Sequence, residues 1–181
     1  CCLVCSEMCI RDSLKLSEHR EFIHFGLTSQ DINNTAIPLS IKDFLEEVYI
    51  PMINNLLSSI DKNCKDLKNI TIISRTHGQP ASPTKLGKEF RVFWTRITNQ
   101  LSTLKKIPNS AKFAGAVGNF NAHKVAYPKI DWKEFGQNFI ENELNLNYSF
   151  PTTQIEHYDS LAALFDNCRR INNILLDMSL D

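Results

Sequence analysis

The sequence lacks an excess of charge of either sign. Its 20 basic residues balance its 20 acidic residues, and the sequence pI is about 7.1. Proteins that bind nucleic acid usually carry a basic patch, and charged tails appear as runs of like charge. Because the chain has neither feature, we expect no nucleic-acid partner. Any anionic ligand must therefore be held by local geometry.

Long apolar runs, internal repeats and low-complexity segments are also missing. A helix that crosses a bilayer needs about 20 consecutive, mainly apolar residues, and the sequence contains no such run. The 181 residues are 43% hydrophobic, which is enough to bury one sizeable core. We therefore expect a soluble protein with no membrane partner.

Cysteine is scarce in the body of the chain, where only Cys64 and Cys168 occur. These two lie on apolar helical faces and suit a reducing cytoplasm. The other four cysteines, whose spacing could in principle ligate zinc or form disulfides, are Cys1, Cys2, Cys5 and Cys9. We reject both uses, because residues 1–13 resemble the translated read-through of a sequencing adapter. We therefore expect neither a metal nor an organic cofactor.

Apolar residues at steps of three and four predict long helices over about residues 33–67, 84–106 and 156–181. Pro51 lies within the first helix and predicts a kink there. The first stripe consists of Ile41, Leu45, Val48, Met52, Leu56 and Ile60. Such lengths exceed those of ordinary globular helices and indicate an all-α bundle that buries helix faces between subunits. The last helix carries no stop signal, so we expect the chain to end inside it.

Residues 108–130, between the second and third long helices, show little helical period. Loops of more than about 12 to 15 residues in compact domains are usually functional or disordered. The aromatic and small residues of this stretch favour order, so we expect a loop that lines a site. A short amphipathic helix over about residues 132–144 follows it.

His77 lies in the run Arg75-Thr76-His77-Gly78-Gln79-Pro80-Ala81-Ser82-Pro83. Proline is favoured in the first turn of a helix, so Pro83 predicts a helix start and places His77 in the approach loop. An imidazole there could donate a proton near neutral pH. The alternative is a loop histidine that is hydrogen-bonded to its surroundings.

Two further segments place polar side chains ahead of apolar periodic runs. Thr28 and Asp31 fit a capping box, which would expose the hydroxyls of Thr28 and Ser29 at a helix N-terminus, where anions bind. The alternative is a plain N-cap with no ligand. Gln154 precedes the last helix, and its amide could both donate to and accept from a polar ligand.

Together these segments resemble the adenylosuccinate lyase family of the fumarase/aspartase superfamily. The superfamily blocks are Thr28-Ser29-Gln30-Asp31 and Thr76-His77-Gly78-Gln79-Pro80-Ala81. The more specific matches are Phe22-Ile23-His24-Phe25, Gly115-Ala116-Val117-Gly118-Asn119-Phe120-Asn121-Ala122-His123, Tyr127-Pro128 with Asp131-Trp132, and Thr152-Thr153-Gln154-Ile155-Glu156. The resemblance runs from about Glu18 to the C-terminus. It implies that residues 14–181 form a partial lyase domain, comprising the end of the N-terminal domain and the first part of the central helical bundle.

The resemblance also implies a reaction and the roles of four residues. The reaction is β-elimination of fumarate from adenylosuccinate, giving AMP, and from the analogous succinyl-aminoimidazole carboxamide ribotide. His77 would be the general acid, Thr28 and Ser29 would bind an anionic part of the substrate, and Gln154 would orient it. The catalytic base, a serine in a loop of the family, would lie beyond Asp181, so the isolated chain is expected to be inactive.

The resemblance further implies a cytoplasmic homotetramer with no cofactor. We assign structural or supporting roles to the remaining histidines that lie near aromatic residues, namely His24, His123 and His157. Two alternatives remain open. One is another lyase or cycloisomerase of the superfamily, and the other is a non-catalytic helical assembly module.

Overall fold

The computed structural model describes residue 19 and residues 22–181, so the expected boundary after Ser13 lies outside the described residues. The chain folds as two compact units. The first contains the described residues up to Ser40 together with Asn109–His157, and the second contains Ile41–Pro108 and Tyr158–Asp181. No helix of the described part is both long enough and apolar enough to cross a membrane.

The first unit contains the start of one long helix, α2 (Ser29–Phe44), and several short elements. The short elements are β3 (Ser110–Ala111), α5 (Asn121–Ala126), α6 (Trp132–Asn138), the π-helical turn η3 (Phe139–Glu143) and β4 (Asn147–Tyr148). β3 and β4 pair in parallel. The expected irregular stretch 108–130 is therefore only partly irregular, because it contains β3 and the helix α5. The predicted amphipathic helix over 132–144 is confirmed as α6 and η3.

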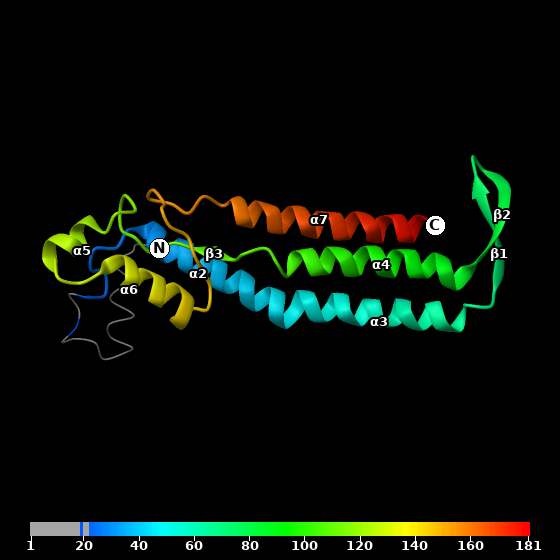
Figure 1. The fold of residues 1–181 in the computed structure, drawn as a ribbon, viewed down its shortest axis with the longest axis horizontal. Helices are drawn as coiled ribbons and strands as arrows, with labels where there is room; N and C mark the ends of the chain where they lie inside the picture. Colours follow the sequence, from blue (N-terminus) through cyan, green and yellow to red (C-terminus); the bar gives the residue numbers. More distant parts are fainter. Residues whose placement is uncertain (1–18, 20–21) are drawn as a thin grey trace. The chain divides into compact units, whose positions relative to one another are not determined.

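Three long helices of the second unit lie side by side, as Figure 1 shows. They are α3 (Ile50–Asp66), α4 (Leu86–Leu104) and α7 (Asp159–Leu180). α4 packs against both of the others. The buried core between them consists of Ile53, Leu57, Ile60, Cys64, Phe93, Ile97, Leu101, Leu104, Leu164, Ile171 and Ile174. The predicted bundle of long helices is thus confirmed.

A π-helical turn, η2 (Leu45–Tyr49), joins α2 to α3 directly before Pro51, the residue at which the sequence predicts a kink. The N–H of Ile50 donates to the carbonyl of Leu45, five residues back, and Pro51 has no N–H with which to continue an ordinary ladder. The wider turn shifts the phase of the apolar stripe. As a result Val48 and Met52, which the periodicity placed on the stripe, are 43% and 65% exposed, while Ile53 enters the core.

The segment around His77 is a β-hairpin, which corrects the expectation that it approaches a helix. β1 (Thr71–Thr76) pairs antiparallel with β2 (Gln79–Lys85), and the hairpin extends beyond the long helices near the C-terminus (Figure 1). Pro83 lies in β2, and α4 begins only at Leu86. Proline is tolerated here because a two-stranded ribbon has only edge strands.

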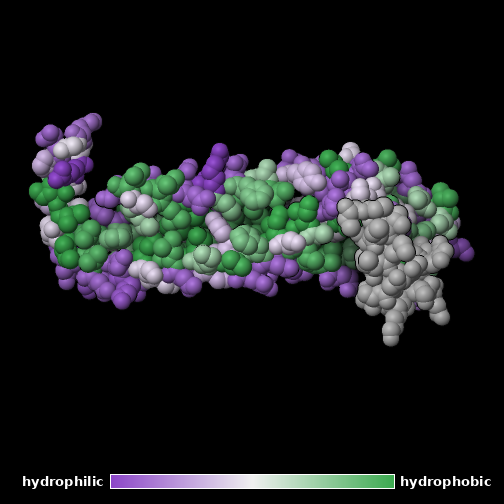
Figure 2. All heavy atoms as spheres, turned by 180° about the vertical axis from the view of Figure 1, so that it is seen from behind, coloured by the Kyte–Doolittle hydropathy of each residue, from purple (hydrophilic) through white to green (hydrophobic). Residues whose placement is uncertain are grey.

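Apolar side chains remain exposed along the helices of the second unit. In the left part of Figure 2, hydrophobic residues form a green band along these helices, with hydrophilic residues in purple beneath it. The large exposed apolar residues of η2, α3, α4 and α7 are Val48, Met52, Val92, Phe165, Leu176 and Leu180. An apolar surface of this kind usually marks an association site.

Candidate functional site

The predicted anion site at the start of α2 forms half of a capping box. The carboxylate of Asp31 accepts a hydrogen bond from the N–H of Thr28, with 2.9 Å between the nitrogen and Oδ2. The hydroxyl of Thr28 accepts from Nε2 of Gln154 at 3.2 Å. Ser29, the first residue of the helix, is exposed. The structure therefore brings three of the four predicted site residues together in the first unit.

Asp31 is itself buried beneath this cradle, by which we mean Thr28, Ser29 and Gln154. Its side chain has no exposed surface, and its Oδ1 lies 2.7 Å from Nζ of Lys112, which is equally buried. The same oxygen accepts from the N–H groups of Ala114 at 2.9 Å and Gly115 at 3.2 Å. With the bond from Thr28, this carboxylate has four donors, so its burial is fully compensated.

Lys112 ties the following loop to α2 by two further bonds. Its Nζ donates to the carbonyl of Gly115 at 2.6 Å, and its backbone N–H donates to the carbonyl of Asn34 at 3.1 Å. Asn34 is also buried, one turn along α2 from Asp31. The first two turns of the helix and residues 112–115 are therefore connected through both main chain and side chains.

The glycine loop then leads directly to the Gln154 segment. Gly118 has a φ of +78°, and a Cβ at this position would overlap the carbonyl oxygen of Thr152. Only glycine lets the two main chains approach this closely without strain. Hydrogen bonds connect Thr28 to Asp31, Asp31 to Gly115 and Gly115 to Gly118. Gly118 packs against the main chain of Thr152, and Gln154, two residues further along, donates back to Thr28.

His123 lies at the centre of an aromatic group in the same unit. The rings within 6.0 Å of its own, measured between centroids, are those of Phe25, Phe113, Phe120 and Trp132. Its side chain is 1% exposed. Burial lowers the pKa of the imidazole, an effect that the nearby Asp31 carboxylate opposes. His123 therefore favours the neutral form, in keeping with a structural role.

His77 belongs to the second unit and occupies the tip of the β1–β2 hairpin. Thr76 pairs with Gln79, so His77 and Gly78 form a two-residue turn, with φ values of +52° and +73°. Two successive positive φ values are typical of a type I′ turn. His77 is exposed, so the turn presents its imidazole to solvent. Of the other histidines given a structural role, His157 contacts the carbonyl of Pro151 at 3.1 Å and His24 is half-buried.

Sequence reasoning missed Lys112 and Gly118. The only signal for Lys112 is a charged residue between Ala111 and Phe113, just before a glycine-rich segment, in a stretch with no periodicity. Its partner Asp31 lies 81 positions earlier in the sequence, and the sequence pattern predicts for Asp31 only a role at the start of a helix. Within the described residues, no group of three or more His, Cys, Asp or Glu side chains has the arrangement of a metal site.

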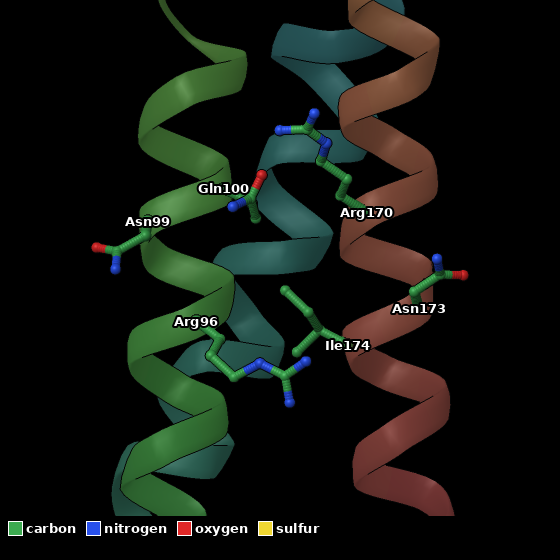
Figure 3. Close-up of a pocket in the computed structure, with 6 residues that line it drawn as sticks. All are labelled: Arg96, Asn99, Gln100, Arg170, Asn173 and Ile174. Carbon is green, nitrogen blue, oxygen red and sulfur yellow. The ribbon is translucent and has the colours of Figure 1, made fainter.

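A polar groove of about 350 Å³ lies between α4 and α7 and contains none of the predicted site residues. Figure 3 shows the side chains of Arg96 and Arg170 directed into the space between the helices, whereas Asn99 and Asn173 point away from it. Arg96 also donates to Asp177 at 2.7 Å. The side chains that line the groove are mainly those of arginine, asparagine and glutamine residues of α4 and α7.

Comparison with known proteins gives one family and consistent relatives. The model of the family described as Lyase matches residues 4–181. The chain is 51% identical over 164 residues to adenylosuccinate lyase of Dictyostelium discoideum, covering 89% of this chain and 35% of that protein. It is 42% identical over 161 residues to adenylosuccinate lyase of Escherichia coli K12, with the same coverage of 89% and 35%.

A solved structure shares the fold. The fumarate lyase from Mesorhizobium sp. BNC1 superposes with a TM-score of 0.76 at 21% identity, over 89% of this chain and 38% of that one. The predicted long-helix fold of the superfamily is thereby confirmed. The chain spans about a third of the length of the curated relatives it matches, 35% in both cases named above.

Proposed function

Because this chain belongs to the lyase family, we propose that the protein of which it forms part is an adenylosuccinate lyase. The reaction is β-elimination of fumarate from adenylosuccinate, giving AMP, and from succinyl-aminoimidazole carboxamide ribotide in purine synthesis. The 51% identity to a protein named adenylosuccinate lyase is the observation that carries the proposal. The meeting of Thr28 and Gln154, which the resemblance assigns to substrate binding, supports it.

The elimination requires two proton transfers around one bond. A base removes a proton from the succinyl carbon beside a carboxylate, which leaves an aci-carboxylate that needs hydrogen-bond donors. The carbon–nitrogen bond then breaks, the carbon–carbon double bond of fumarate forms, and an acid protonates the departing nitrogen. We assign the acid to His77, whose imidazole is exposed to solvent at the tip of the hairpin, where it can donate a proton to a bound substrate.

The cradle of Thr28, Ser29 and Gln154 would hold an anionic part of the substrate. The N-terminus of α2 contributes the partial positive charge of a helix dipole, and the exposed Ser29 hydroxyl can donate. The Gln154 amide donates one hydrogen to Thr28 and retains a second hydrogen and its carbonyl oxygen for a polar ligand. This group binds and orients, while His77 transfers the proton.

We further propose a homotetramer in which several subunits contribute to each site. The exposed apolar residues of the second unit, such as Met52 and Phe165, need a partner surface. His77 stands at the tip of a hairpin that extends beyond the helices of its unit, and we infer that it completes the cradle of another subunit. We place this enzyme in the cytoplasm, in keeping with the free thiols of Cys64 and Cys168.

The test is fumarate release by a full-length protein that carries this chain, purified free of host enzyme. Adenylosuccinate and the imidazole-carboxamide analogue are supplied separately, with argininosuccinate and malate as controls for related lyases. The proposal expects turnover of the first two substrates only. Turnover of a control substrate instead, or of none, would reject it in favour of a related lyase or a non-catalytic module.

A further inference from the structure

We propose that Lys112 is a positioning residue that keeps the cradle of Thr28, Ser29 and Gln154 receptive to anions by neutralising the buried carboxylate of Asp31. This inference rests on the proposed function only in taking the cradle to be the anion site. Lys112 would act through Asp31 and would not itself touch the substrate, because its side chain has no exposed surface.

The distances place a full negative charge directly behind the cradle. Oδ2 of Asp31 lies 2.9 Å from the backbone nitrogen of Thr28. A carboxylate this close adds a repulsive charge beside the very N-terminus that would attract an anion, and burial strengthens the repulsion because water screens it poorly. The ammonium of Lys112, 2.7 Å from Oδ1, removes the net charge.

The carboxylate is nevertheless needed, which explains why the molecule retains a buried pair. Asp31 accepts from Thr28, Ala114 and Gly115 and so holds the cradle against the loop that leads to Gly118. A neutral acceptor has fewer lone pairs and forms weaker bonds. Asp31 thus supplies the geometry, and Lys112 supplies the charge that makes this geometry compatible with an anionic ligand.

A purely structural role for the pair makes a different prediction. If the two side chains only hold the fold, removing both damages the site at least as much as removing one. If charge is what matters, the double variant Asp31→Asn/Lys112→Met buries no net charge and binds anions better than Lys112→Met alone. The comparison of single and double variants therefore separates the two roles.

The experiment uses the full-length enzyme and measures kcat and KM for adenylosuccinate. We expect Lys112→Met to raise KM by about tenfold or more, the usual effect of losing a bond to a charged group, with kcat changed by less than about threefold. We expect Lys112→Arg to retain near-normal KM and the double variant to recover much of the loss. The matched control is Lys124→Met, an exposed lysine on α5 of the same unit.

A folded Lys112→Met enzyme with unchanged KM, or a double variant no better than Lys112→Met, would overturn the proposal. If Lys112→Met does not fold, the double variant decides: KM within about fivefold of wild type supports the proposal, and a larger increase refutes it. If the wild-type enzyme has no lyase activity, the proposed function fails separately. The same variants are then compared for inorganic phosphate binding by calorimetry, where the same order of affinities is expected and any other order refutes the role of Lys112.

Discussion

Gln154 donates a hydrogen bond to the hydroxyl of Thr28, 126 positions earlier in the sequence, with 3.2 Å between Nε2 and Oγ1. This bond joins the start of α2 to the segment that precedes α7. We expect Thr28→Val and Gln154→Ala each to raise KM for adenylosuccinate more than they lower kcat, because both leave the proposed proton donor in place. A double-mutant cycle should give a coupling of about 0.5–1.5 kcal/mol, and strictly additive effects would contradict a functional contact.

Gly118→Ala tests the close approach of the glycine loop to Thr152. The new Cβ would overlap a main-chain carbonyl oxygen, and φ at this position is +78°. We expect a loss of more than about 2 kcal/mol in the free energy of unfolding of the full-length enzyme. The matched control is Gly78→Ala, which has a similar φ of +73° but open space around the Cβ. Equal losses in the two variants would show that only backbone strain matters.

His123 should make the protein less stable in mild acid. Burial lowers the pKa of its imidazole, so the unfolded chain binds the proton more readily than the folded protein. The stability that the neutral ring contributes is complete above the unfolded pKa of about 6.5, and it falls as the pH drops below that value. We expect His123→Leu to lose less stability than wild type between pH 8 and pH 5.5, measured by urea unfolding. An unchanged difference between the two pH values would contradict this account.

The 181-residue chain by itself should self-associate. Apolar residues such as Met52, Phe165 and Leu176 are 65%, 58% and 61% exposed along the helices of the second unit. We expect light scattering to report species larger than a monomer and the triple change to lysine to reduce them. A sharp monomer peak for the unchanged chain, with cooperative unfolding, would contradict the prediction.

Much of the helical framework could be predicted from the sequence because it depends on local periodicity. Phe93, Ile97, Leu101 and Leu104 form the buried face of α4 with the expected spacing. The start of α2 was also predictable, since Thr28 and Asp31 satisfy a rule that spans only three residues. These features require no knowledge of distant contacts.

The remaining features depend on contacts that periodicity does not carry. The π-helical turn before Pro51 changes which side chains face the core, so the regular spacing of apolar residues wrongly predicts that Val48 is buried. The strands around His77 contain two prolines, Pro80 and Pro83, and their sequence is typical of a loop. Thr71 to Lys85 nevertheless form a ladder, which side-chain hydrogen bonds such as that from Lys85 to Thr71 support. The ion pair of Asp31 with Lys112 joins two segments that are far apart in the sequence, and no sequence pattern indicates that they meet.

Replacement of His77 by alanine in the full-length enzyme tests the central claim most directly. The account predicts that kcat falls by roughly 10²–10⁴-fold, the usual contribution of a positioned proton donor, with the thermal midpoint unchanged because the side chain is exposed at a hairpin tip. Thr28 and Ser29 variants, measured alongside, should affect KM instead. A folded His77→Ala enzyme with near-normal kcat would contradict the assignment of His77 as the general acid.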